Sequence, residues 1–251
     1  MNKEAIRVGD LDIGPSPIKI CIPLWGTGDE DIFAEGQKAA ALSCHLIEWR
    51  VDYLPKARYL SWEENKLRIR TLKAQTKKPI LVTLRTKAEG GNAQVSQGEY
   101  LEFLRGIIQV GEEVLLDIEA FFLGDCCNTV IKEAREKGIK TLLSHHNFEK
   151  TPQLEELKNR FFAMEELGGD VLKLAAMPHA QEDVERLIAA ASQVKEDGVK
   201  TPLVAISMGE LGSKTRIPSA ENLSALTFAA TDKASAPGQI SLEKMNSYIC
   251  E

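Results

Sequence analysis

The sequence predicts a parallel (β/α)8 barrel, the TIM-barrel architecture, with a short β-hairpin at its N-terminus. Segments with the character of strands and of helices alternate roughly eight times along the chain, and no linker interrupts them. The length of 251 residues is typical of such a barrel. We therefore expect one barrel domain over residues 1–251, with the hairpin in residues 1–16.

A doubly wound open sheet is the alternative fold for a chain that alternates in this way. That fold commonly carries a glycine-rich turn for a dinucleotide early in the chain. The corresponding turn here is Trp25-Gly26-Thr27-Gly28, which lacks the third glycine. The pattern therefore favours the barrel.

The composition excludes several classes of function. Hydrophobic residues make up 43% of the chain, which is enough for a sizeable core, and charged residues make up 27% with a net charge of −6. A nucleic-acid-binding protein would normally show a basic stripe. No apolar run approaches the roughly 20 residues that span a membrane, and the first residues lack the apolar core of a signal peptide. We expect a cytoplasmic protein that binds neither nucleic acid nor membrane.

The cysteines do not form a disulfide framework. Their number is odd, two of them are adjacent, and no Cys-x-x-Cys pair is present, so we expect free thiols and no structural zinc site. The adjacent pair Cys126-Cys127 lies in a predicted helix, and the sequence assigns it no function. The five cysteines are Cys21, Cys44, Cys126, Cys127 and Cys250.

The first half of the chain contains the hairpin and four strand–helix units. Gly9-Asp10 is typical of a tight turn and joins two short apolar segments, 5–8 and 11–13. An acidic first turn from Asp29 favours a helix start, and Gly138 favours a helix end. The predicted strands are 18–24, 46–51, 79–84 and 114–118, the predicted helices are 29–43, 62–75, 100–110 and 126–137, and a polar loop spans 85–97.

The second half repeats the same alternation. Leu154, Leu157, Phe161 and Met164 lie on one face of a helix expected at 152–167. Thr151-Pro152 is read as its cap and first helical position. The other predicted helices are 181–194, a short one after a loop at 208–218, and 239–248, while the predicted strands are 140–144, 170–178, 202–207 and 226–230. A small polar loop spans 231–238.

Polar side chains follow the apolar part of one strand after another. The carboxyl ends of the strands form the active site in (β/α)8 enzymes, so these side chains are candidates for one site. We expect Asp52, Asp117 and Glu119 to form internal salt bridges rather than to react. Arg50 is a partner for Asp117 or for Asp52. The residues at these ends are Glu48, Arg50, Asp52, Arg85, Glu89, Asp117, Glu119, His145, His146, Lys173, Met208, Ser235 and Gln239.

Lys173 lies inside the apolar strand Asp170-Val171-Leu172-Lys173-Leu174-Ala175-Ala176-Met177-Pro178. A buried ammonium must lose its charge, find a partner or extend to solvent. A desolvated lysine has a lowered pKa and supplies an amine that forms a Schiff base with a ketone. The alternative from this stretch alone is an ordinary solvated lysine on an edge strand.

Six segments in chain order resemble one family. They are Glu48-Trp49-Arg50-Val51-Asp52, Leu84-Arg85-Thr86 with Glu89-Gly90-Gly91, Ser144-His145-His146-Asn147-Phe148, Leu172-Lys173-Leu174-Ala175 with Met177-Pro178, Ser207-Met208-Gly209 with Thr215-Arg216, and Ser235-Ala236-Pro237-Gly238-Gln239. With these segments the chain resembles type I 3-dehydroquinate dehydratase, a (β/α)8 enzyme family of the shikimate pathway. Trp25 and Ile206 stand where relatives commonly carry methionine, and Thr215 where they carry serine.

The resemblance implies a syn elimination of water from 3-dehydroquinate, which gives 3-dehydroshikimate through an imine on Lys173. It makes His146 the base, with Glu89 as a partner that orients it. His145 should face the opposite way, as a strand-end histidine bonded to a carboxylate, because side chains alternate along a strand. The substrate-binding set that the resemblance implies is Glu48, Arg50, Arg85, Arg216, Ser235, Gln239, Phe148 and Met208. Ser235 and Gln239 lie on a last loop that is read as a lid.

The resemblance also implies a homodimer and a small-molecule substrate, with no cofactor besides the covalent imine and no metal. A cluster of His145, His146, Asp117 and Glu119 is the alternative that would hold a metal. Two other functions stay open: a class I aldolase, which also forms a lysine imine, and a barrel that binds a ligand without catalysis. The sequence does not distinguish aromatic biosynthesis from quinate breakdown.

Overall fold

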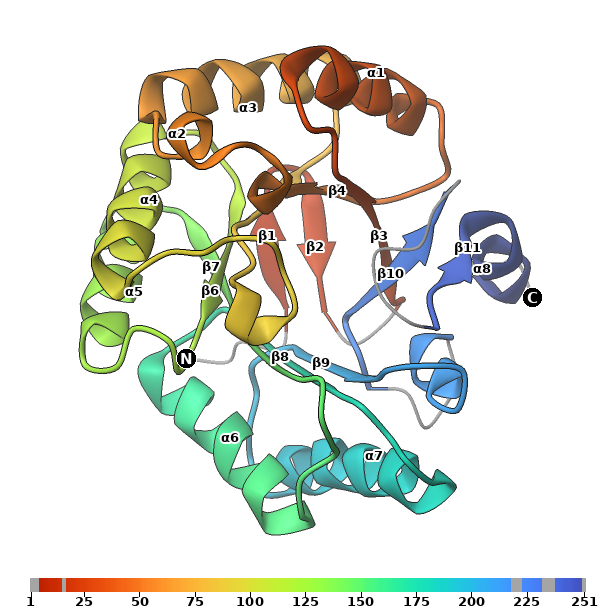
Figure 1. Ribbon diagram of the computed structural model, residues 1–251. Helices are drawn as coiled ribbons and strands as arrows, with labels where there is room; N and C mark the ends of the chain where they lie inside the picture. Colours follow the sequence, from red (N-terminus) through yellow and green to blue (C-terminus); the bar gives the residue numbers. More distant parts are fainter. Residues whose placement is uncertain (1–4, 15–16, 218–222, 232–237, 250–251) are drawn as a thin grey trace.

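The computed structural model describes residues 5–14, 17–217, 223–231 and 238–249. Parallel strands form a ring, with the helices on its outer side (Figure 1). In the part of the chain that is described, no helix is both long and apolar enough to cross a lipid bilayer.

A sheet of parallel strands has the order β11-β10-β3-β4-β5-β6-β7-β8-β9. At the seam between β9 and β10, the backbone N–H of Ala225 donates to the carbonyl of Leu203 at 2.7 Å. This contact closes the ring, so the open-sheet alternative is wrong. The strands are β3 (Lys19–Leu24), β4 (Leu46–Arg50), β5 (Ile80–Thr83), β6 (Leu115–Glu119), β7 (Lys140–Asn147), β8 (Val171–Ala176), β9 (Leu203–Ser207), β10 (Leu226–Ala230) and β11 (Ile240–Ser241).

The predicted hairpin is present. β1 (Ile6–Val8) pairs antiparallel with β2 (Leu11–Ile13), and Gly9 adopts a φ of 58° in the turn between them. Apolar side chains of the hairpin pack with the side chains that fill the inside of the barrel, among them Leu46 and Val171. The hairpin therefore closes one end of the barrel and leaves the other end for the polar residues.

Helices cover the outer face of the ring. A larger apolar layer lies between them and the strands, and a smaller one fills the barrel interior, because alternate strand residues point to opposite faces. The helices are α1 (Asp29–Ala40), α2 (Lys56–Tyr59), α3 (Trp62–Thr76), α4 (Gln97–Val110), α5 (Cys126–Glu136), α6 (Leu154–Leu167), α7 (Gln181–Glu196) and α8 (Leu242–Ile249). Within the described residues, 3-10 turns occur at Val51–Tyr53, Lys87–Glu89 and Ser213–Arg216.

The boundaries differ from the prediction at a few places. α4 begins three residues earlier than expected, because Ser96 and Glu99 form a capping box at its N-terminus. α6 begins at Leu154, since the Thr151 hydroxyl donates to the carbonyl of Met177 rather than capping the helix. β7 continues to Asn147, past the predicted end at residue 144. The short helix expected after residue 218 and the loop at 231–238 fall largely outside the described residues.

Candidate active site

Many of the polar residues at the carboxyl ends of the strands face one cavity. The residues that were predicted to react or to bind substrate line it, except Ser235, which lies outside the described residues. Of the other strand-end residues, Asp52, Asp117, Glu119 and His145 do not line it. The lining residues are Glu48, Arg50, Arg85, Glu89, Gly90, His146, Phe148, Lys173, Ala175, Ile206, Met208, Arg216, Phe228 and Gln239.

Lys173 projects from the middle of β8 and is 6% exposed. Burial lowers the pKa of its ammonium, and the positive charge of Arg85 lowers it further, although the carboxylate of Glu48 acts in the opposite direction. The Nζ atom lies 4.1 Å from the centre of the Phe228 ring, on β10. A buried amine with a lowered pKa therefore faces the cavity, as the sequence predicted.

His146, at the end of β7, is anchored twice by Glu89. The ring Nδ1 lies 2.9 Å from Glu89 Oε2, and the backbone N–H of His146 donates to the same oxygen at 3.1 Å. Burial lowers the pKa of His146 well below its ordinary value, as do the charges of Arg85 and Lys173, while Glu89 opposes them. In the neutral ring Nδ1–H donates to Glu89, so Nε2 carries the lone pair of a base.

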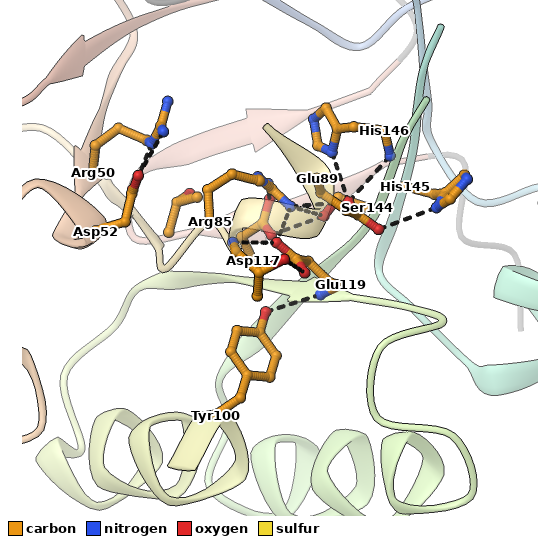
Figure 2. A network of polar contacts seen from close by, with 12 residues as sticks. Arg50, Asp52, Arg85, Glu89, Tyr100, Asp117, Glu119, Ser144, His145 and His146 are labelled. Atoms are coloured by element: carbon orange, nitrogen blue, oxygen red, sulfur yellow. Dashed lines mark hydrogen bonds and ion pairs between the residues drawn. The ribbon is translucent and has the colours of Figure 1, made fainter. Parts of the chain in front are cut away.

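His145 does not line this cavity, in agreement with the expected alternation of side chains along β7. Its ring nevertheless reaches the same carboxylate, with Nδ1 3.1 Å from Glu89 Oε1. Figure 2 shows Glu89 between the two histidines and Arg85. The expectation that His145 bonds to a carboxylate is therefore confirmed.

Glu89 reaches this position from the 3-10 turn after β5. Gly90 follows it with a φ of 79°, a conformation that favours glycine. A Cβ on Gly91 would lie 2.2 Å from the carbonyl oxygen of Arg85, so the turn folds back tightly on the end of the strand. The two glycines explain how a loop carboxylate comes to lie beside a histidine from β7.

Arg85 is the centre of a buried ionic network. Its Nη2 lies 2.7 Å from Asp117 Oδ2, and its Nη1 lies 3.1 Å from Glu119 Oε1 and 3.3 Å from Glu89 Oε2. Burial lowers the pKa of Arg85, but these carboxylates outweigh it and raise the pKa well above the ordinary value. Asp117 and Glu119 are therefore held in salt bridges, as predicted. Ser144 joins the network by accepting from Arg85 at 2.8 Å.

Arg50 is paired with Asp52 and not with Asp117. Two hydrogen bonds of 2.8 Å run from its Nε and Nη2 to the two oxygens of Asp52. The backbone N–H of Asn92 also donates to Asp52, at 3.0 Å. Glu48, two residues earlier on β4, accepts from the Thr83 hydroxyl at 2.9 Å. Glu48 and Arg50 thus line the cavity in orientations that these hydrogen bonds fix.

Arg216 lies in the 3-10 turn after β9 and is 2% exposed. Burial lowers its pKa to about 10. The Thr227 hydroxyl donates to its backbone carbonyl at 2.7 Å, which ties the turn to β10. Thr215 accepts from the backbone N–H of Ser207 at 3.0 Å, so the threonine at this position makes a structural bond. A desolvated guanidinium of this kind suits a carboxylate ligand.

The remaining predicted residues divide between the cavity and its surroundings. Met208 and Phe148 line the cavity, and the Phe148 ring is stacked 6.4 Å from that of His146. Gln239 also lines the cavity. Of the other two departures from the usual pattern, Ile206 lines this cavity, whereas Trp25 lines a separate hollow between β3 and α1. The lid expected at 231–238 falls largely outside the described residues.

Phe228, Gly90 and Ala175 also line the cavity, although they were not predicted as site residues. Phe228 is the aromatic residue of β10, and alternation along the strand gives it two possible faces, inside the ring or toward the helices. The pairing of the strands around the barrel places its ring beside Lys173. The sequence alone does not decide between the two faces. Gly90 could have been found, because two consecutive glycines directly after Glu89 indicate a tight turn at that carboxylate.

Comparison with known proteins places the chain in a family. The sequence profile described as type I 3-dehydroquinase matches residues 20–249. The 3-dehydroquinate dehydratase of Enterococcus faecalis is 36% identical over 246 residues, which cover 98% of this chain and 97% of that protein. The 3-dehydroquinate dehydratase of Klebsiella pneumoniae is 34% identical over 98% of this chain and 98% of its own.

Solved structures agree with the sequence relatives. The crystal structure of the type I enzyme from Clostridium difficile, with covalently modified comenic acid, has a TM-score of 0.91 and 34% identity, over 100% of this chain and 98% of that one. The enzyme from Geobacillus kaustophilus has a TM-score of 0.90 and 30% identity, over 100% of this chain and 97% of that one. The chain therefore belongs to the type I 3-dehydroquinase family.

Proposed function

We propose that the protein is a 3-dehydroquinate dehydratase, a hydro-lyase that eliminates water from 3-dehydroquinate to give 3-dehydroshikimate. The observation that carries this proposal is the position of Lys173, a buried amine with a lowered pKa, in one cavity with His146 and Arg216. An amine, a base and an anion-binding guanidinium are the groups that an imine-based elimination on a carboxylate substrate needs.

In the first step, the Lys173 amine attacks the substrate ketone. The ketone oxygen takes one proton from the attacking amine and one from solvent and leaves as water, which leaves a positively charged iminium. The iminium withdraws electrons and acidifies the neighbouring carbon. It is the electron sink of the reaction, so the steps proposed here use no metal and no cofactor. The ring of Phe228, 4.1 Å from Nζ, suits a cation at this position.

His146 then removes the proton from the acidified carbon through Nε2. The electron pair forms an enamine, the tertiary hydroxyl leaves, and the proton on His146 converts it to water on the same face, which makes the elimination syn. Hydrolysis of the imine releases 3-dehydroshikimate and restores Lys173. Glu89 keeps the His146 ring in place throughout, and general acid–base catalysis of this kind typically contributes about 10²–10⁴-fold.

The other cavity residues are proposed to bind the substrate. Arg216 forms a bidentate contact with its carboxylate, for which a planar guanidinium is suited. Glu48, Arg50 and Arg85 contact its hydroxyl and carboxylate groups. Phe148 and Met208 form apolar walls. Ser235 and Gln239 contribute contacts from the last loop, which is proposed to close over the imine and exclude water.

The assembly and location of the protein are further proposals. The family resemblance supports a homodimer, and sedimentation of the purified protein tests it. The absence of a basic stripe and the mixed surface charge support a cytoplasmic enzyme whose partner is the small-molecule substrate. Either aromatic biosynthesis or quinate breakdown would use the same reaction.

An assay of enone formation tests the proposed reaction. Dehydration gives a conjugated enone carboxylate that absorbs in the near ultraviolet, whereas aldol cleavage does not. The wild-type protein should produce this absorbance from 3-dehydroquinate, and Lys173→Met should fall to background. Lys19→Met is the matched control, because Lys19 begins β3 and does not line the cavity. Binding of 3-dehydroquinate without turnover would overturn the proposal and favour a non-catalytic barrel.

A further inference from the structure

His145 contacts charged groups from two different elements. Its Nδ1 faces Glu89 Oε1 at 3.1 Å, and its Nε2 lies 2.6 Å from Nη1 of Arg160, on α6. Arg160 in turn donates through Nη2 to Glu156 at 2.7 Å, one turn earlier in the same helix. A chain of contacts thus runs from the surface of α6, through His145, to the carboxylate that anchors His146.

The contact with Arg160 determines the tautomer of His145. A guanidinium has only donors, so at 2.6 Å the Nε2 atom must be the acceptor and carry the lone pair. The ring proton of the neutral imidazole then lies on Nδ1, where it points at Glu89 Oε1. Both histidines therefore donate Nδ1–H to the same carboxylate, one to each oxygen.

The two oxygens of Glu89 have different sets of donors. Oε2 accepts from the His146 ring, the His146 backbone N–H and Arg85. Among the described residues, the donor that reaches Oε1 is the His145 ring. The Glu89 side chain is only 9% exposed, so an Oε1 without that donor would lose a bond that water is poorly placed to replace.

Phe121 holds this arrangement from the outside. Its ring meets the His145 ring edge-to-face at a centroid distance of 5.3 Å, and the Arg160 guanidinium lies 5.5 Å from the same ring. Phe121 follows β6, so three elements, β6, β7 and α6, converge on His145. An edge-to-face contact and a cation–π contact both restrict rotation of the groups involved.

We propose that His145 is a positioning residue for the reaction: fixed by Arg160 as the Nδ1–H tautomer, it holds Glu89 so that Oε2 faces His146. This inference rests on the proposed function, since positioning matters only if His146 is the base. It assigns a role to a residue outside the cavity, and it makes α6 part of the support of the catalytic histidine. Loss of the support allows Glu89 to rotate and misaligns the His146 ring.

Histidine NMR tests the tautomer without any need for turnover. In protein labelled with ¹⁵N-histidine, the ring nitrogens of His145 and His146 should both show the neutral Nδ1–H form at neutral pH. The signals that disappear in His145→Asn identify His145. A neutral Nε2–H form of His145, or a doubly protonated ring, would overturn the inference, because Nε2 would then carry a proton and could not accept from Arg160.

Kinetics of paired variants test the positioning role. His145→Leu removes the donor to Glu89 and should lower kcat by about 10–100-fold, the range typical of outer partners, with KM changed less than about twofold. His145→Asn keeps an N–H near the place of Nδ1 and should stay within about threefold of wild type. Equal kcat for wild type and His145→Leu would overturn the inference, as would an equal loss in both His145 variants.

Arg160→Leu should also lower kcat, by about threefold to tenfold. Without the guanidinium, His145 can adopt the Nε2–H tautomer, which does not donate to Glu89. Arg105→Leu is its control: Arg105, on α4, forms a similar helix-surface ion pair with Glu133, on α5, and this pair is separate from the ion pairs of Arg85 and Glu89. An unchanged kcat in Arg160→Leu would contradict the role given to α6. If the wild type shows both Nδ1–H tautomers but does not turn over 3-dehydroquinate, the proposed function itself fails, which is a separate result from a fully active His145→Leu.

Discussion

Burial shifts the pKa of several ionisable side chains at the carboxyl end of this barrel. It lowers the pKa of Lys173 and His146, and it raises the pKa of Glu119 to about 7. The neutral amine and the neutral imidazole are the forms that attack a ketone and accept a proton. The place of Lys173 and His146 inside the protein therefore favours the uncharged forms that the proposed reaction uses.

Glu119 predicts a pH dependence of stability with a definite sign. Its pKa of about 7 in the folded protein lies above the ordinary 4.5, because burial outweighs the hydrogen bonds from Thr86 and the charge of Arg85. The stability it contributes is fully present below pH 4.5 and is lost as the pH rises to about 7, an interval worth about 3 kcal/mol. Between pH 4.5 and about 7, the free energy of unfolding of wild type should therefore fall by about 3 kcal/mol more than that of Glu119→Gln.

Urea unfolding at a series of pH values between 4.5 and 7.5 measures this difference. Glu133→Gln is the control, because the hydrogen bond from Arg105 lowers the pKa of Glu133, so Glu133 titrates below pH 4.5 and should add almost no slope over this range. A difference between wild type and Glu119→Gln that stays constant over this range would mean that Glu119 is ionised throughout, in contradiction to the expected titration.

Among single residues, the sequence predicted Lys173 and His146 as members of one site but not the residues that contact them from other elements. Lys173 was detectable because a charged residue interrupts an apolar strand. Arg160 was not, since an arginine on an amphipathic helix is ordinarily solvated, and nothing local relates it to His145. The contact depends on how α6 packs beside β7, which is a property of the tertiary structure.

The loop after β5 is the element on which the site depends most. It carries Arg85 at its start and Glu89 in its 3-10 turn, and Gly91 packs against the backbone of Arg85. The backbone N–H of Gly91 donates to the carbonyl of Thr86 at 2.8 Å, which closes the turn. The sequence predicted this segment only as a glycine-rich polar loop, because a 3-10 turn has too few residues to show periodicity.

Gly91→Ala should damage the site more than the fold. Its Cβ would lie 2.2 Å from the Arg85 carbonyl oxygen, so the turn must shift and Glu89 must move with it. A displacement of about 1 Å at a reacting group can cost about 100-fold in rate, so we expect kcat/KM for 3-dehydroquinate to fall by about that factor. The free energy of unfolding should fall by only about 1–3 kcal/mol.

Gly98→Ala is the matched control for this substitution. Its Cβ would meet only Ser96 Oγ, at 3.9 Å, in the first turn of α4. Activity should be unchanged and the helix slightly more stable, since alanine favours a helix more than glycine does. If Gly91→Ala retained the activity of Gly98→Ala, the turn would not position Glu89 as described.

The barrel as a whole explains why residues from Glu48 to Gln239 share one cavity. Each strand delivers its polar residues to the same end, and the hairpin of β1 and β2 packs into the interior on the apolar side. The alternation of strands and helices was sufficient to predict this arrangement. The side-chain partners were only partly predictable. The sequence left Arg50 between Asp52 and Asp117, and the structure pairs it with Asp52. The place of Phe228 beside Lys173 depends on strand register and side-chain orientation.

The central claim is that Lys173 forms an imine with the substrate. Incubation of the protein with 3-dehydroquinate and sodium borohydride, followed by peptide mass spectrometry, tests it most directly. We expect a reduced adduct on Lys173 and on no other lysine, and no adduct in Lys173→Met. Turnover of 3-dehydroquinate without any adduct would contradict it, because the elimination would then proceed without an imine and Lys173 would be a structural residue.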